Sequence, residues 1–218
     1  MKLDFESIKT DLERLRSAKK RPNVFGAESH GFQLNPPLPE SAVIKFEKRH
    51  NILLPADYRR FLIELGNGGA GPYYGLFKLG EMDDSFDHAR WKENDGFVGD
   101  LSEPFPHTAP WNDLTGEPEC DEENEEEYDR QWNIFEKRYW NAANVDGAIP
   151  VCHLGCAYRQ WLVITGPEAG NIWCDDRTDL KGLHPLSAKG KRRVTFYEWY
   201  RGWLDEAIQK LDIRKRRR

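Results

Sequence analysis

Cysteine and histidine residues in the last third of the chain are the first candidates for chemistry. Cys152, His153 and Cys156 form a C-H-x-x-C sequence, and Cys174 and His184 follow it. A zinc site of this kind ordinarily needs two matched pairs of ligands, and no second pair is present. Adjacent residues of a strand point to opposite faces, so Cys152 and His153 are poorly placed to share a metal or to form a nucleophile–base pair. The pattern predicts buried thiols and an ordinary histidine, with no structural metal and no cofactor.

A glycine-rich segment, residues 66–75, has the composition of a phosphate-binding loop but not its context. It follows a predicted helix rather than a strand, and neither G-K-[ST] nor G-x-G-x-x-G occurs in it. Glycine accepts the positive φ angles that a helix end and a tight turn require. The segment therefore predicts a helix cap followed by a turn.

Acidic residues are concentrated in the middle of the chain. Residues 81–129 contain 18 acids and two bases, whereas the whole chain of 218 residues has a net charge of −5. Within this segment, residues 117–129 hold nine acids and no base, without the loop pattern of an EF-hand. Two interpretations remain open: the solvated start of a helix, or a docking face that steers a basic partner.

Two further charged groups could carry function. Asp175 and Asp176 end a predicted strand and precede His184, so an unrecognised enzyme site could form there. Acids in a turn that accept backbone N–H bonds are the more frequent arrangement. The basic tail, residues 214–218, could touch nucleic acid, but no aromatic platform or nucleic-acid module accompanies it. A solvated chain end without nucleic-acid binding is the expectation.

The elements that must position these residues follow from hydrophobic periodicity. Apolar spacings of three and four predict helices at 5–15, from about 39, at 55–65, at 128–139 and at 195–211. Runs rich in β-branched and aromatic residues predict strands at 75–79, 149–154, 160–165 and 171–174. The last three are joined by short turns, which favours an antiparallel meander. Thr195 and Glu198 have capping-box spacing at the start of the last helix.

The fold class that follows is α+β, a twisted and mainly antiparallel sheet with helices packed at the N- and C-terminal ends. We expect a single domain over residues 1–218, with an acidic insertion at 81–148 and a disordered basic tail at 212–218. One core is predicted to join Phe61, Leu62, Trp161, Val163, Trp199 and Trp203. The chain lacks a long apolar run and a signal-peptide pattern, and it has only four cysteines, which predicts a soluble protein of the reducing cytoplasm.

Three stretches, taken in order, resemble the SUKH superfamily, which is characterised by the Smi/Knr type of domain. The N-terminal signature of that family is similar to LPADYRRFLIELGNGGAGPYYGLFKL, residues 54–79. Its bacterial strand meander is similar to VCHLGCAYRQWLVITGPEAGNIWCDDR, residues 151–177, and its closing helix to TFYEWYRGWLDEAI, residues 195–208. The resemblance places the family core at about 39–80 and 149–208. The acidic segment between them departs from the family pattern.

The resemblance implies a SUKH-like α+β domain with a role that is not catalytic. Bacterial members are immunity proteins that bind and neutralise a cognate polymorphic toxin, often a nuclease. The family has no universal catalytic motif to transfer onto this sequence. Two alternatives stay open: a general protein-interaction or regulatory scaffold without a toxin partner, and an enzyme with its site around Asp175, Asp176 and His184.

The acidic segment is predicted to be the partner-binding face. An acidic surface can occupy the basic cleft in which a nuclease holds the phosphate backbone. Tyr128 and Trp132 could add an aromatic anchor, although burial against the domain's own sheet is the stronger expectation for Trp132. The partner would be the basic nuclease domain of a toxin, with no direct binding of nucleic acid or membrane. The acids assigned to this face are Glu122, Glu123, Glu125, Glu126, Asp129, Asp83, Asp84 and Asp87.

Overall fold

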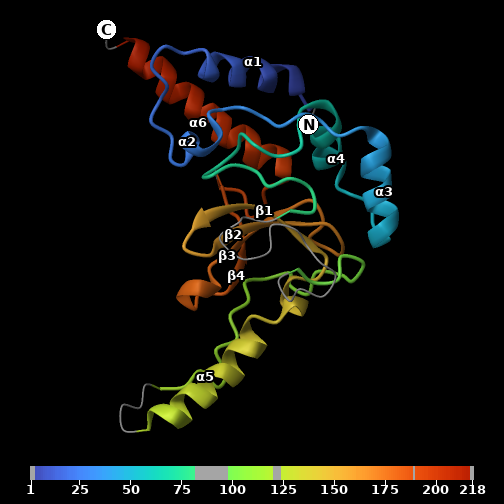
Figure 1. The fold of residues 1–218 in the computed structure, drawn as a ribbon, viewed down its shortest axis with the longest axis vertical. Helices are drawn as coiled ribbons and strands as arrows, with labels where there is room; N and C mark the ends of the chain where they lie inside the picture. The colour runs from blue at the N-terminus through green and yellow to red at the C-terminus, as the bar shows by residue number, and fades with distance from the viewer. Residues whose placement is uncertain (1–2, 82–97, 120–123, 189, 217–218) are drawn as a thin grey trace.

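Six α-helices and a four-stranded antiparallel sheet make up the described part of the chain. The structure is a computed structural model, and it describes residues 3–81, 98–119, 124–188 and 190–216. The elements in chain order are α1 (Phe5–Arg16), α2 (Ala27–His30), α3 (Glu40–His50), α4 (Ala56–Glu64), α5 (Glu125–Tyr139), η1 (Ala142–Val145), β1 (Ala148–Gly155), β2 (Tyr158–Val163), β3 (Ile172–Asp175), η2 (Arg177–Asp179), β4 (Leu183–Pro185) and α6 (Phe196–Arg216). This arrangement confirms the α+β class, with helices at both ends of the chain (Figure 1).

The sheet is a meander in which each strand pairs with the next one along the chain. Cys156 and Ala157 connect β1 to β2, and both have positive φ, as a two-residue hairpin turn requires. The sequence did not predict β4, since three residues are too few to show an alternation. The strand expected at 75–79 is wrong, because only isolated bridges from Leu76 to Gly69 and to Cys152 form there.

The two faces of the sheet bury separate apolar clusters. Leu162 and Ile172 pair across β2 and β3 and belong to the larger cluster, which the helices cover. Trp161 and Trp173 form the neighbouring pair, and they belong to a smaller cluster on the other face. The period of two along a strand separates the two sets. The expectation of one joint core was therefore wrong in its topology, although Phe61, Leu62, Trp161, Val163 and Trp199 are all buried and Trp203 is partly buried.

Local hydrogen bonds fix the start of the last helix. The backbone N–H of Thr195 donates to the Glu198 carboxylate at 3.2 Å, and the N–H of Glu198 donates to the Thr195 hydroxyl at 3.3 Å. These reciprocal bonds confirm the predicted capping box. At its other end α6 continues to Arg216, so residues 212–216 have a helical backbone where a disordered tail was expected. None of the described helices is long and apolar enough to cross a membrane.

An arm projects from the end of the molecule opposite α1 and α6 (Figure 1). It consists of α5 and the segment of residues 112–119. Acids in the first turn of α5 and bases in its last turn complement the helix dipole, as the sequence predicted. The Asn124 side chain caps the helix by accepting the N–H of Glu127. The arm places most of the described acidic run away from the body of the protein.

Candidate protein-interaction surface

The side chains of α5 separate into faces because successive residues of an α-helix are rotated by about 100°. An aromatic face carries Tyr128, Trp132, Phe135 and Tyr139, at spacings of four, three and four. Beside it lies an acidic face. Arg130 and Lys137 lie on the side opposite the aromatic residues, and the Arg138 guanidinium lies 5.8 Å from the ring centroid of Phe135. We call the acidic face the acidic stripe; it comprises Glu125, Glu126, Asp129 and Glu136.

All four carboxylates of the acidic stripe are exposed, and none forms an ion pair with another described residue. Glu127 differs, because its carboxylate accepts hydrogen bonds from Arg130 at 2.6 Å and from Gln131 at 2.7 Å. These bonds lower the pKa of Glu127 to about 2. The charge of the stripe is therefore not compensated by described residues, whereas the Glu127 carboxylate is already paired within the helix.

The aromatic face is covered only in part. The rings of Tyr128 and Trp132 stack with their centroids 6.2 Å apart, and Trp132 also contacts Phe135 at 5.4 Å. Phe135 and Tyr139 are buried, whereas Tyr128 and Trp132 are half-buried and belong to neither apolar cluster of the sheet. The expectation that Trp132 is buried against the sheet was therefore wrong. The cause is the projection of the arm, which carries the first half of α5 beyond the body (Figure 1).

Three of the acids assigned from the sequence, Glu125, Glu126 and Asp129, lie on this surface. The other five, Glu122, Glu123, Asp83, Asp84 and Asp87, lie outside the described residues. Sequence reasoning missed Glu136, which stands apart from the acidic run. Its spacing of seven from Asp129 could have identified it, since residues seven apart share a helix face.

A buried ion pair anchors the base of the arm to the sheet. Arg177 and Asp175 are only 4 % and 1 % exposed, and two hydrogen bonds of 2.8 and 2.7 Å join the guanidinium to the carboxylate. Arg177 also donates to the Tyr139 carbonyl at 3.3 Å and lies 4.6 Å from the ring centroid of Trp140. Trp161 donates to the same carboxylate at 3.0 Å. The end of α5 is thus tied to β2 and β3 by a hydrogen-bonded buried charge pair.

A second anchor joins the arm to β4. Trp111 and Leu183 form a two-way backbone bridge at 2.8 Å in each direction. The Trp111 ring stacks on Tyr139, whose hydroxyl donates to Asn112 at 2.6 Å. Gly182 lies so close that a Cβ there would fall 1.9 Å from the Trp111 carbonyl oxygen. This contact requires glycine, so the arm and the sheet edge are packed backbone against backbone.

Of the three residues considered for an enzyme site, the structure brings Asp176 and His184 together and directs Asp175 to Arg177. Asp175 is committed to Arg177 in the smaller cluster, whereas Asp176 contacts the His184 ring nitrogen at 2.9 Å. Cys174 pairs with His184 across β3 and β4, but burial raises the pKa of its thiol to about 11. A thiol with that pKa is a poor nucleophile near neutral pH. These residues form a structural ion pair and an edge contact.

The C-H-x-x-C residues also separate. Cys152 is buried in the larger cluster, and burial raises the pKa of its thiol. His153 stacks between the rings of Tyr74 and Phe77, at centroid distances of 4.9 and 5.6 Å. The described part of the chain contains no group of three or more His, Cys, Asp or Glu side chains arranged to hold a metal ion.

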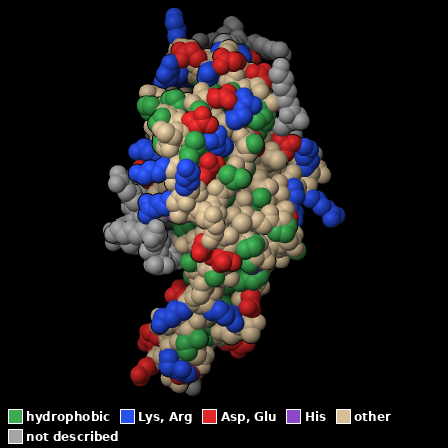
Figure 2. All heavy atoms as spheres, turned by 90° about the vertical axis from the view of Figure 1, so that its right-hand side faces the viewer, with side chains coloured by type: hydrophobic (Ala, Val, Ile, Leu, Met, Phe, Trp, Pro, Cys, Tyr) green, Lys and Arg blue, Asp and Glu red, His purple; other side chains and the backbone are tan. Residues whose placement is uncertain are grey.

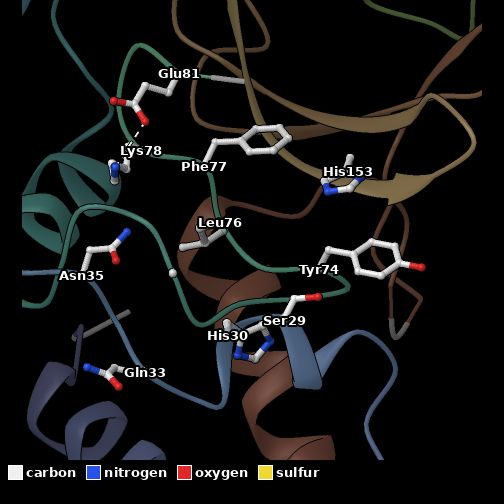
Figure 3. A pocket seen from close by; sticks show the side chains of 11 residues that line it. Ser29, His30, Gln33, Asn35, Tyr74, Leu76, Phe77, Lys78, Glu81 and His153 are labelled. Atoms are coloured by element: carbon white, nitrogen blue, oxygen red, sulfur yellow. Dashed lines mark ion pairs between the residues drawn. The ribbon is translucent and has the colours of Figure 1, made fainter. Parts of the chain in front are cut away.

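A polar hollow of about 490 Å³ lies beside His153 (Figure 3). Its wall includes His30 and the ion pair of Lys78 with Glu81, whose charged atoms are 3.4 Å apart. The Nδ1 atom of His30 accepts the Phe32 N–H at 3.0 Å. Burial lowers the pKa of His30 to about 4, although the Gly71 backbone and the Glu28 charge favour its protonated form. His30 is therefore neutral at pH 7.

The pKa of His30 predicts a loss of stability in mild acid. The unfolded chain, with the ordinary value of 6.5, binds more protons than the folded chain between about pH 6.5 and 4, so the contribution of His30 falls as the pH drops through that range. His30→Asn preserves an acceptor for Phe32 and removes the titration. We expect the variant to lose about 1–2 kcal/mol less than the wild type between pH 7 and 4.5, a discounted value because the ring is only partly buried.

Urea unfolding at several pH values measures this difference. Burial also lowers the pKa of His107, so both proteins should retain part of the acid sensitivity. If the free energy of unfolding falls by the same amount with pH in the wild type and the variant, His30 is not a source of the acid sensitivity.

Searches against known protein families, curated proteins and solved structures find no match for this chain. The SUKH resemblance thus stays a prediction that depends on the residues quoted for it. What the fold and the site define is an α+β protein with a projecting, acidic and partly aromatic arm. That combination makes the arm the candidate surface for protein interaction.

Proposed function

We propose that the protein is a non-catalytic immunity protein of the SUKH type, which binds and neutralises a cognate polymorphic toxin in the cytoplasm. The observation that carries the proposal is the acidic stripe on a helix projecting from the body. A long unpaired row of carboxylates costs charge repulsion within its own helix. A basic partner would relieve that repulsion and form charge-assisted hydrogen bonds.

A nuclease domain is the toxin class that fits this surface best. Its active cleft carries basic side chains that hold phosphates at regular intervals along the nucleic acid. A helix with Glu125, Asp129 and Glu136 on one side presents anions in a row that such a cleft can accept. Tyr128 and Trp132 lie beside the stripe and supply apolar area, since half-exposed aromatic residues are frequent anchors of protein interfaces.

A role without catalysis is supported by how the other candidate groups are used. The Asp175 carboxylate is engaged by Arg177 and Trp161 inside the protein. The raised pKa values of Cys152 and Cys174 favour unreactive thiols. A scaffold that binds a partner other than a toxin would use the same surface. The two roles differ in the partner, so binding to the toxin domain encoded by the neighbouring gene distinguishes them.

The triple variant Glu125→Lys/Asp129→Lys/Glu136→Lys should bind the toxin domain encoded by the neighbouring gene more slowly. Charged residues at an interface act mainly on the association rate, so we expect a loss of about tenfold or more at low salt. The difference should shrink at about 0.5 M salt, where exposed charges are screened. Stopped-flow or surface-plasmon-resonance association rates measure both effects.

The matched control is Glu28→Lys/Glu103→Lys/Glu206→Lys, which makes the same charge change at three exposed acids of the body that form no ion pair with described residues. It should retain most of the association rate. Equal losses in both triple variants would show that net charge matters and the stripe does not. If the wild type fails to bind that toxin and fails to protect cells from it, the immunity role is wrong.

A further inference from the structure

A second candidate surface lies on the flank of the molecule, on α3 and the turn that follows it. Leu53 is 80 % exposed and Ile44 is 37 % exposed. Both line a hollow of about 780 Å³ between α3 and the segment that follows β2, with Lys48 and Thr165 also in its wall. We call the group Ile44, Lys45, Lys48 and Leu53 the α3 face. A leucine and an isoleucine exposed together on one hollow are more than scattered surface apolar residues.

The exposure of Leu53 is built into the fold. Its neighbours Ile52 and Leu54 are buried, and both of their N–H groups donate to Glu47, at 3.0 and 3.1 Å. Glu47 is itself buried and paired with Arg59 at 3.3 Å. The turn is thus held on both sides of Leu53. A rigid, exposed apolar side chain is preorganised for binding, because little entropy is lost when a partner covers it.

The charge of the α3 face is positive. Lys45 and Lys48 are exposed, and neither forms an ion pair with a described residue. The nearby carboxylates of Glu40 and Glu47 share the single guanidinium of Arg59, so these three groups together carry one negative charge, and the two lysines leave the face with a net positive charge. The face therefore fits an occupant that combines apolar side chains with carboxylates. Figure 2 shows this flank, with Lys and Arg side chains on the body and the arm projecting below.

We propose that the occupant is a second copy of this chain, in a two-fold dimer where the acidic stripe of each α5 lies on the α3 face of the other copy. The stripe supplies four unpaired carboxylates, and Tyr128 beside it supplies apolar area. Within one copy α5 and α3 lie apart, so the two surfaces cannot satisfy each other (Figure 1). When two copies lie side by side with their long axes antiparallel, the arm of each copy runs along the flank of the other. The two contacts are then identical, as two-fold symmetry requires, and no further copy can be added through them.

This inference does not depend on the toxin-binding proposal, since it concerns the protein alone. The dimer would cover the same acidic stripe that the toxin contact uses. A toxin and a second copy would therefore compete for the stripe. When a toxin is present, the contact of the stripe with the α3 face would be replaced by its contact with the toxin.

Sedimentation velocity of the full chain over a range of concentrations tests the proposal. We expect a monomer–dimer equilibrium that shifts toward monomer as the salt concentration rises. Lys45→Glu/Lys48→Glu and, separately, Glu125→Lys/Asp129→Lys should each weaken the dimer about tenfold or more, because each places like charges across both contacts. The control Lys19→Glu/Lys20→Glu reverses two exposed lysines that lack ion pairs with described residues, and it should dimerise as the wild type does.

The sharpest test mixes the two charge-reversed proteins. In the mixture, one copy carries an acidic face and an acidic arm, and the other carries a basic face and a basic arm. Both contacts are then complementary again, so the mixture should form a heterodimer although each variant alone is monomeric. Circular dichroism confirms that each variant is folded. A wild type that stays monomeric at all concentrations, or a dimer indifferent to these reversals, would overturn the proposal.

Discussion

Replacing Arg177 with methionine should destabilise the protein by about 3–5 kcal/mol, because it leaves the Asp175 carboxylate buried without its counter-charge. The pair is almost wholly excluded from solvent, and its bonds are 2.7 and 2.8 Å. The substitution also removes the cation beneath Trp140 and the bond to the Tyr139 carbonyl. Urea unfolding measures the loss, and the near-ultraviolet circular dichroism of the tryptophans reports whether the base of the arm is rearranged.

Burial is the property on which this expectation depends, and the chain offers a control that differs mainly in burial. Arg60 also forms two hydrogen bonds with a carboxylate, that of Glu64, and lies 4.8 Å from the ring centroid of Phe5. That pair is exposed, so Arg60→Met should cost about 1 kcal/mol or less. Equal costs at the two sites would contradict the argument.

A double-mutant cycle separates pairing from desolvation. Asp175→Asn keeps an acceptor for the Trp161 N–H and removes the charge. Each single change leaves one buried charge without its partner, whereas the double change removes both charges. The double variant Asp175→Asn/Arg177→Met should therefore lose at least about 1–2 kcal/mol less free energy of unfolding than the two single variants lose in sum. Strict additivity would show that the two groups do not depend on each other.

Gly182→Ala should be the most damaging single-atom change in the described part of the arm's anchorage. A Cβ at this position would lie 1.9 Å from the Trp111 carbonyl oxygen, and the backbone has a φ of +73°. The close approach is between two backbones, so no side chain can rotate away from it. We expect a loss of about 2–5 kcal/mol, the sum of left-handed strain and overpacking. Thermal or urea unfolding measures it.

Gly116→Ala separates the two contributions. Gly116 has almost the same φ, +72°, but a Cβ there would meet nothing within 4 Å. Its substitution should cost only the left-handed strain, about 1–2 kcal/mol. If the two alanine variants are equally stable, the contact between Gly182 and Trp111 does not restrict the fold.

Elements made by neighbours in the chain could be predicted from the sequence. The stripe on α6 and its capping box depend on residues three and four apart, and the structure confirms both. Helix α5 and its aromatic spacing were predicted for the same reason. The first three strands have short turns between them, so their antiparallel order follows from chain connectivity.

Some of what was missed was present in the sequence as a period. Trp161 and Leu162 are adjacent in β2, so they must face opposite sides of the sheet, and a single core containing both Trp161 and Phe61 was inconsistent with that alternation. Glu136 likewise follows from the helical period of α5. Applying the strand period of two and the helix period of about 3.6 to each residue would have predicted both the two separate cores and the position of Glu136.

Other features depend on contacts between residues far apart in the chain. No local pattern brings Trp111 to Leu183, or places Arg177 beneath Trp140 at the end of α5. Those contacts aim α5 away from the sheet, and that direction leaves Trp132 half-exposed. The sequence by itself thus determined that residues 125–139 form an acidic and aromatic helix. Only the tertiary structure decided that this helix stands out as an arm, because a helix takes its direction from the distant side chains and backbone that anchor its end.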